Sequence, residues 1–213
     1  MNITDIHMEQ FIEAAHEAGV NKLMLCSSGN LSWRIDDYAL VSGTGSWLPK
    51  IRKEQLSICN ITTGEVYNDV KPSMESTFHL AVLCERKDMN VVLHCQSEYA
   101  TVVACMKNRP ANFNVTAEIP CYNGSEIGVV PYFRPGSPEL AKAVTEVMKN
   151  HDTALLVNHG QVVVGKDFDD ALQRAIFLEM ACAIIVRSGM QYNTLNEKDI
   201  ADLDYYIKGK VSK

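Results

Sequence analysis

Short apolar runs separated by turn-forming residues divide this chain into brief helices and strands. Behind the capping pair Thr4 and Asp5, apolar and small side chains recur at helical spacing as far as Gly19, which predicts a first helix. Residues 22–42 instead alternate apolar runs with turn residues, a pattern typical of short antiparallel strands. The N-terminal part of the chain therefore predicts a helix followed by a strand meander.

Helices and strands alternate through the rest of the chain. Helices are predicted at residues 73–86, 99–106, 137–148, 167–188 and 197–209, and strands at 91–95, 154–157 and 161–164. Because the strands come in runs with helices between and around them, we expect an α/β fold with a central, mainly antiparallel sheet flanked by helices. The length of 213 residues and the lack of a linker-like segment predict a single domain over residues 1–213.

The composition is that of a folded protein and restricts the partners. Hydrophobic residues make up 46% of the chain and charged residues 22%, so a substantial core is available. The net charge of -6 argues against nucleic acid as a partner. A phosphate group would have to bind to backbone amides and hydroxyls, because the protein offers no basic field.

Cysteine usage and the N-terminal segment predict a cytoplasmic location. The seven cysteines are odd in number, form no CxxC pair and lie mostly in apolar runs, which is typical of reduced thiols. The N-terminal segment has no secretion signal, and no apolar run approaches the roughly twenty residues that cross a bilayer. We therefore expect no contact with a membrane.

Polar residues with metal-binding chemistry stand at the ends of two predicted strands. His94 and Gln96 are two residues apart and share a face where strand 91–95 ends, whereas Cys95 turns the other way. His159 follows an apolar strand and precedes Gly160, which permits a close backbone approach. Taken alone, His94 is more often a hydrogen-bonded structural residue than a metal ligand, and His159 is more plausibly a turn histidine.

Glu75 and two glycine-containing turns are further candidates. Glu75 begins a predicted helix, where the helix dipole favours a carboxylate and capping alone would explain it. His79 lies one turn later on the same face, and we favour a structural role for it. The turns SSGN at 27–30 and SGTGS at 42–46 cluster amides and hydroxyls that can bind an anion, although each alone is also an ordinary turn.

In order and spacing, these segments together resemble the class II aldolase/adducin family, especially its L-fuculose-phosphate aldolases. The resemblance extends over nearly the whole chain, so it is more specific than any single motif. The segments that carry it are SGNLS at 28–32, SGTG at 42–45, KPSMESTFH at 71–79, VVLHCQSEYAT at 91–101 and LLVNHG at 155–160.

The resemblance implies one divalent metal ion per subunit, Zn²⁺ being expected. His94 and His159 would hold it, with Glu75 as a ligand that also acts as acid or base. Gln96 stands where these aldolases carry another histidine, and its neutral amide oxygen is a poorer zinc ligand than imidazole. Cys95 would replace it only if the strand ended early.

The implied reaction cleaves L-fuculose 1-phosphate, or a related ketose 1-phosphate, to dihydroxyacetone phosphate and L-lactaldehyde. Glu75 would move a proton to and from a metal-stabilised enediolate. A tyrosine from a neighbouring subunit, here Tyr205 or Tyr206, would transfer a proton at the aldehyde oxygen, and the family implies a homotetramer with active sites between subunits. The residues expected to bind the phosphate are Gly29, Asn30, Thr44, Gly45, Ser73 and Met74.

Other functions on the same scaffold stay open. Gln96 and Met74, which replaces a serine of the aldolases, depart from the aldolase pattern, although the Met74 amide can still donate. An epimerase or dehydratase of another sugar phosphate is one alternative, but the epimerases tend to carry aspartate where Glu75 stands. A metal-free binding protein like the adducin head is another, and the retained Glu75, His94 and His159 argue against it.

Overall fold

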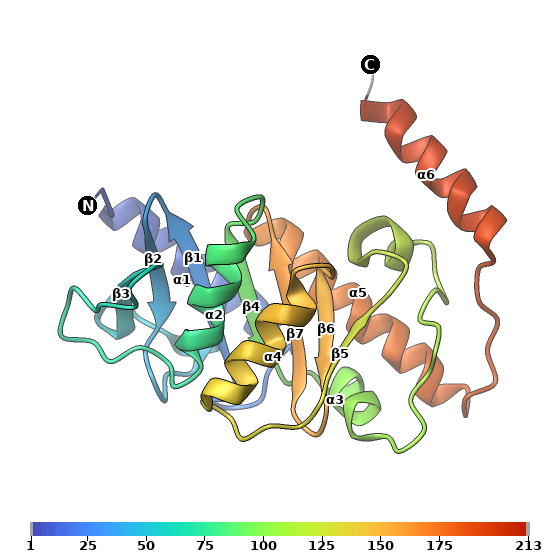
Figure 1. The fold of residues 1–213 in the computed structure, drawn as a ribbon, viewed down its shortest axis with the longest axis horizontal. Coiled ribbons are helices and arrows are strands. Elements are labelled where there is room, and N and C mark those ends of the chain that lie inside the picture. Colours follow the sequence, from blue (N-terminus) through green and yellow to red (C-terminus); the bar gives the residue numbers. More distant parts are fainter. Residues whose placement is uncertain (1, 212–213) are drawn as a thin grey trace.

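One twisted sheet with helices on both faces organises the protein (Figure 1). The computed structural model describes residues 2–211. Its helices are α1 (Asp5–Val20), α2 (Ser76–Glu85), α3 (Glu98–Cys105), α4 (Pro138–Met148), α5 (Phe168–Arg187) and α6 (Glu197–Val211). Its strands are β1 (Gly29–Ile35), β2 (Tyr38–Ser42), β3 (Leu56–Asn60), β4 (Val91–Cys95), β5 (Gly128–Val130), β6 (Thr153–Leu156) and β7 (Gly160–Gly165).

The sheet is mainly antiparallel, which confirms the predicted fold class. Its strand order is β3-β2-β1-β4-β7-β6-β5, and only the β5–β6 pair among the described strands is parallel. The two outermost strands of this sheet, β3 and β5, were not predicted from the sequence. Each pairs with a single neighbouring strand, and β5 is only three residues long, so the local pattern of each is weak.

Alternation along β4 sends its side chains to two different cores. Val91, Leu93 and Cys95 pack with α1 and α5, whereas Val92 packs with α2 and α4. Figure 1 shows α2 and α4 in front of the sheet and α1 and α5 behind it. Because the period of a strand is two, His94 lies on the α2 side, and its ring contacts that of Phe78 on α2 at 5.9 Å between centroids.

The start of α2 differs from the prediction. The predicted helix began at Ser73, but α2 begins at Ser76 and leaves Glu75 at its N-cap position. The physical reason lies in the sheet, because the Ser73 amide donates to the Ser42 carbonyl at 2.9 Å and Pro72 bridges Gly43. Residues 71–73 thus continue the β2 edge before the helix can start.

The last helix leaves the body of the protein. α6 follows residues 188–196 and extends away from the sheet in Figure 1. Within the described residues, no helix is long and apolar enough to cross a membrane.

Candidate metal centre and active site

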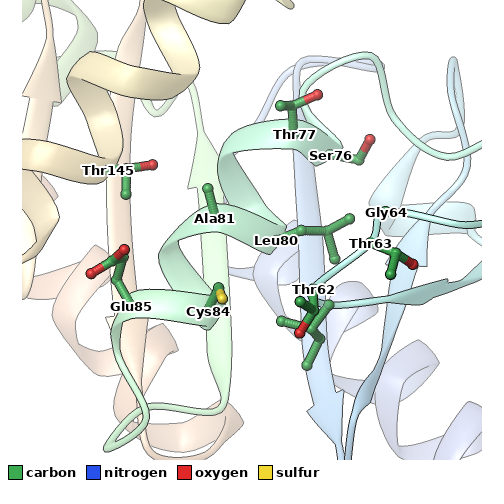
Figure 2. Close-up of a pocket in the computed structure, with 11 residues that line it drawn as sticks. Thr62, Thr63, Gly64, Ser76, Thr77, Leu80, Ala81, Cys84, Glu85 and Thr145 are labelled. Carbon is green, nitrogen blue, oxygen red and sulfur yellow. The ribbon is translucent and has the colours of Figure 1, made fainter.

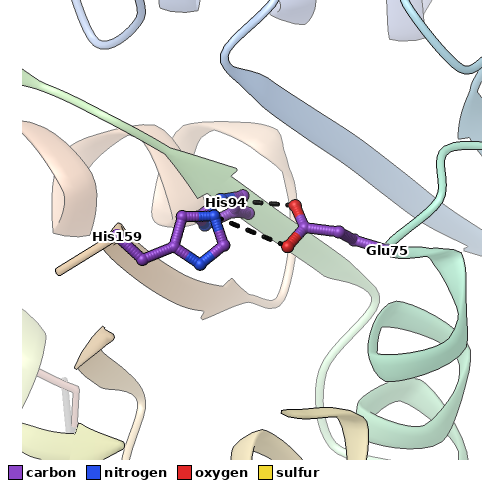
Figure 3. A group of neighbouring side chains, drawn as sticks. All are labelled: Glu75, His94 and His159. Carbon is purple, nitrogen blue, oxygen red and sulfur yellow. Dashed lines mark ion pairs between the residues drawn. The ribbon is translucent and has the colours of Figure 1, made fainter. Parts of the chain in front are cut away.

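Glu75, His94 and His159 converge at one end of the sheet, as the family resemblance implied. Glu75 precedes α2, His94 is near the end of β4, and His159 lies in the turn between β6 and β7 (Figure 3). His94 Nε2 is 3.4 Å from Glu75 Oε2, and His159 Nε2 is 3.6 Å from Glu75 Oε1. One ligand atom from each residue lies within 4.8 Å of the others. All three side chains are nearly inaccessible to solvent.

The hydrogen bond behind His94 fixes its tautomer. His94 Nδ1 is 2.8 Å from the Gln161 carbonyl oxygen, which can only accept. Nδ1 therefore carries the proton, and in the neutral ring the Nε2 lone pair faces the Glu75 carboxylate. Two electron-rich atoms at 3.4 Å repel each other unless a proton or a cation lies between them.

His159 is held neutral beside the same carboxylate. Burial is the main cause that lowers the pKa of His159 to about 4, with a further contribution from His94, while Glu75 acts in the opposite direction. At neutral pH its ring therefore supplies a lone pair rather than a charge.

Two buried atoms of this cluster lack a hydrogen-bond partner among the described residues, Glu75 Oε1 and His159 Nδ1. A carboxylate between two neutral imidazoles is a donor set suited to zinc and related divalent ions. The cluster thus fits a divalent cation, which would engage the orphaned Glu75 oxygen and remove the repulsion between Glu75 and His94.

Glu75 does not cap its helix, so the capping explanation is wrong. Its side chain makes no cap hydrogen bond and instead accepts one from Asn30 Nδ2 at 2.9 Å on Oε2. Asn30 in turn contacts His79, which is fully buried and also bonded to Ser32. The structural role predicted for His79 is consistent with these contacts.

The residues predicted to bind phosphate lie next to this cluster. Gly29 pairs with Cys95 across β1 and β4, and its φ of +146° is one that only glycine readily adopts. The turn that holds Thr44 and Gly45 is joined to residues 71–73 because the Thr44 amide donates to the Lys71 carbonyl at 3.0 Å. Ser73 is buried, whereas Met74 is 63% exposed. Their phosphate-binding role stays a prediction, with the Thr44 amide already engaged within the protein.

Other predicted residues are less closely tied to the cluster. Gln96 is half-buried and its side chain packs against Gly160. A Cβ added to Gly160 would be only 2.9 Å from the Gln96 Cγ, so a larger residue at position 160 would clash with Gln96. Cys95 faces the opposite core, where burial raises the pKa of its thiol, so it does not replace Gln96 as a ligand. Tyr205 is 83% exposed on α6, and the side chain of Tyr206 lies outside the described part of the structure.

Sequence reasoning missed the groups that support His94. Gln161 supplies the carbonyl behind the ring, and its side-chain amide donates to Ser97 Oγ at 2.7 Å. Ser97 donates to Glu179 at 2.6 Å, and Glu179 also accepts the amides of Tyr99 and Ala100 at the start of α3. A polar Gln161 at the head of the apolar run VVV was the signal that could have indicated this role.

A separate groove of about 490 Å³ lies outside the cluster. It runs between α2 and the loop after β3 and is lined mainly by hydroxyl and small side chains, among them Thr62, Ser76 and Ala81 (Figure 2). Its lining includes the outer side of α2 and none of the three cluster residues, so it is not the site described above.

Comparison with known proteins agrees with the geometry. The profile of the Class II Aldolase and Adducin N-terminal domain matches residues 9–186. A 3-oxo-tetronate 4-phosphate decarboxylase of Haemophilus influenzae is 33% identical over 181 residues, which cover 83% of this chain and 86% of that protein. An L-fuculose phosphate aldolase of Methanococcus maripaludis strain C7 is 31% identical over 169 residues, or 79% and 90% of the two chains.

Solved structures include an enzyme with the same fold. The structure of an L-fuculose 1-phosphate aldolase superposes with a TM-score of 0.88 at 21% identity, covering 97% of this chain and 98% of the other. At that identity the superposition concerns the fold alone. Because the family profile spans most of the chain, this protein belongs to the class II aldolase and adducin family.

Proposed function

We propose that this protein is a metal-dependent lyase that breaks a carbon–carbon bond of a small sugar phosphate and leaves the enediolate of dihydroxyacetone phosphate. The observation that carries this proposal is the buried Glu75 carboxylate between two imidazoles, with Oε1 unpartnered. A bound divalent ion would supply the Lewis acid that offsets the negative charge of the enediolate. The carboxylate beside it would exchange a proton with the reacting carbon.

The two kinds of relative converge on one intermediate. In 3-oxo-tetronate 4-phosphate the ketone is β to the carboxylate, so loss of CO₂ leaves the electron pair of the broken C1–C2 bond in an enediolate. Cleavage of the C3–C4 bond of L-fuculose 1-phosphate releases L-lactaldehyde and leaves the same enediolate. In both reactions Glu75, in its protonated form, would deliver a proton to the carbon that lost its substituent.

We favour the decarboxylation of 3-oxo-tetronate 4-phosphate. The decarboxylase relative has both the higher identity and the larger share of this chain covered. CO₂ also leaves without a second proton transfer, whereas aldol cleavage needs a group that takes the proton of the hydroxyl destined to become the aldehyde. Tyr205, the residue predicted for that step, is 83% exposed on α6. Decarboxylation does not need this tyrosine.

L-Fuculose 1-phosphate is the second candidate substrate. The relative of Methanococcus maripaludis supports it, together with the motif resemblance over residues 28–160. A neighbouring subunit of the homotetramer that the family implies would then have to contribute the tyrosine.

One product measurement separates these proposals. Protein stripped with a chelator and reloaded with Zn²⁺ or Mn²⁺ would be given each substrate, and dihydroxyacetone phosphate would be measured with glycerol-3-phosphate dehydrogenase and NADH. A blank without protein corrects for spontaneous loss of CO₂ from the oxo acid. We expect metal-dependent product and equimolar CO₂ from 3-oxo-tetronate 4-phosphate.

Faster product formation from L-fuculose 1-phosphate would instead select the aldolase. Turnover that survives complete metal removal, or no product from either substrate, would contradict the proposal. In the second case, conversion of other sugar phosphates without bond cleavage would indicate an epimerase or dehydratase.

A further inference from the structure

A chain of four buried side chains ends on the Glu75 carboxylate. Ser32 Oγ is 2.8 Å from His79 Nδ1, His79 Nε2 is 2.5 Å from Asn30 Oδ1, and Asn30 Nδ2 is 2.9 Å from Glu75 Oε2. Ser32 and His79 are fully buried, and Asn30 and Glu75 are 6% and 5% exposed. None of these groups therefore exchanges its partner freely with water.

With the Glu75 carboxylate ionised, one arrangement of protons satisfies all three of these hydrogen bonds. The ionised carboxylate can only accept, so Asn30 must donate through Nδ2 and present Oδ1 to His79. His79 Nε2 must then carry the ring proton. Burial, assisted by His94, lowers the pKa of His79 to about 3, so the ring is neutral and its Nδ1 accepts from the Ser32 hydroxyl.

The spacing of the residues explains why the chain forms. Asn30 and Ser32 are two apart on β1 and so point to the same face, toward α2. His79 lies one helical turn after Glu75, so both face the strand from the same side of the helix. The hydrogen bonds thus lock the start of α2 against β1 next to the metal ligands.

We infer that Ser32, His79 and Asn30 form a hydrogen-bonded relay that positions the Glu75 carboxylate. This inference rests on the proposed function. The relay holds Oε2 and leaves Oε1, 3.6 Å from His159 Nε2, as the oxygen available for the metal and the proton. Asn30 and His79 are therefore positioning residues.

Positioning and phosphate binding predict different kinetics. If the relay orients Glu75, its loss lowers kcat and leaves KM nearly unchanged, because the interaction acts on the reacting groups. If Asn30 instead binds phosphate, its loss raises KM with little change in kcat. His79 is the sharper target, since it is buried behind Asn30 and touches no substrate in either case.

A matched pair of variants tests the relay in the full-length, zinc-loaded protein. His79→Leu removes the Nε2–H group that donates to Asn30 and keeps a similar side-chain volume. In His79→Gln, the side-chain amide N–H can donate to Asn30 instead. We expect His79→Leu to lower kcat and zinc affinity by about 10- to 100-fold, with KM changed less than about threefold, as for other residues that orient metal ligands. His79→Gln should recover both to within about fivefold of the wild type.

Zinc affinity, measured by competition with a chromophoric chelator, keeps the test independent of the substrate. If the wild type binds zinc but turns over neither substrate, the proposed function fails while the relay is still judged by the zinc affinities. Thermal unfolding shows whether each variant is folded, and Ser32→Ala gives a second route if His79→Leu is not. Unchanged kcat and zinc affinity in a folded His79→Leu or Ser32→Ala protein, or a rise in KM alone for Asn30→Ala, would overturn the inference.

Discussion

Ionisable side chains gather at both ends of β4, β6 and β7, but their charges are balanced in different ways. At the end opposite the candidate site, Arg86 binds Asp88 and Asp152 at 2.8 and 2.7 Å and also donates to the Met148 carbonyl. Arg174 binds Asp152 at 2.5 Å and Asp170 at 2.8 Å. Each of these two guanidinium groups has negative partners at hydrogen-bond distance.

The site end contains electron donors without a matching positive charge. Glu75 lies 3.4 and 3.6 Å from two histidines, of which His94 is oriented by the Gln161 carbonyl and His159 is held neutral by burial. A cluster of opposite charges is complete within the protein, whereas a cluster of donors needs a cation from outside. The arginine end should therefore govern stability and the site end activity.

Glu75→Gln should show most clearly that the site end controls activity and not stability. Loss of the carboxylate removes both the proton carrier and a metal ligand, so we expect kcat to fall by about 10² to 10⁴-fold. The unfolding free energy of the metal-free protein should not decrease, because a glutamine amide oxygen can still accept from Asn30 Nδ2 and a buried carboxylate is removed. Steady-state kinetics and urea unfolding measure the two effects, with Glu85→Gln at the exposed end of α2 as control.

If metal-free Glu75→Gln were markedly less stable than the wild type, Glu75 would be paired within the protein, and the contrast between the ends would fail.

Asp152→Ala tests the arginine end. Both arginines lose a partner while their side chains stay 13% and 9% exposed, and we expect the unfolding free energy to fall by about 2 kcal/mol. The value is below that of a fully buried pair because the Asp152 side chain is 29% exposed. Urea unfolding measures the loss, and kcat should stay within about twofold.

Asp88→Ala is the matched control for Asp152→Ala. The Asp88 side chain is 58% exposed and forms an ion pair with Arg86 but not with Arg174. Its loss should therefore change the unfolding free energy by less than about 1 kcal/mol. Equal effects of the two substitutions would show that Asp152 does not join the arginines into one unit.

The pH dependence of stability should distinguish the ends within one experiment. Burial is the main cause that lowers the pKa values of His79 and His159 from 6.5 to about 3 and about 4. Between these values and 6.5, both histidines bind a proton in the unfolded chain but not in the metal-free folded protein. The unfolding free energy should therefore fall as the pH drops from about 6.5 to about 4, by up to about 1.4 kcal/mol per pH unit for each histidine.

At the arginine end, the guanidinium of Arg86 is the main cause that lowers the pKa of Asp88 from 3.8, and the stability from this pair is lost only below that pH. Denaturant unfolding of metal-free protein from pH 7 to pH 4 measures the slope. His79→Gln should reduce it by about half. A slope unchanged by that substitution would show that His79 does not titrate as described.

The family resemblance implied that Glu75, His94 and His159 form one site, whereas local patterns only place each of them at an element boundary. The apolar runs VVLHC and LLVNHG mark strand ends, and alternation places His94 on one face. The hydrogen-bond partners were beyond such reasoning, since His79 and Asn30 are 49 residues apart and Gln161 is 67 from His94. Contacts of this separation depend on strand order, which a single sequence does not specify.

The start of α2 and the strands β3 and β5 escaped prediction for a related reason. Ser73 reads locally as a helix cap, yet its amide pairs with Ser42 in the sheet. The side chain of Asn30 bonds to Glu75 and His79, two contacts that the motif SGNLS does not reveal, and its phosphate-binding role stays a prediction. Tertiary pairing overrode the local helix signal at Ser73.

Tyr205→Phe should have the smallest effect. The residue lies on α6, apart from both ends of the sheet, and 83% of it is exposed, so we expect decarboxylation to change by less than about twofold. The assay is the release of dihydroxyacetone phosphate from each substrate by the zinc-loaded variant, with Tyr67→Phe on another exposed tyrosine as control. A loss of about 10²-fold confined to L-fuculose 1-phosphate would mean that Tyr205 of a neighbouring subunit reaches the reacting oxygen. In that event aldol cleavage becomes the favoured reaction, the site is completed by the assembly, and light scattering should find the homotetramer that the family implies.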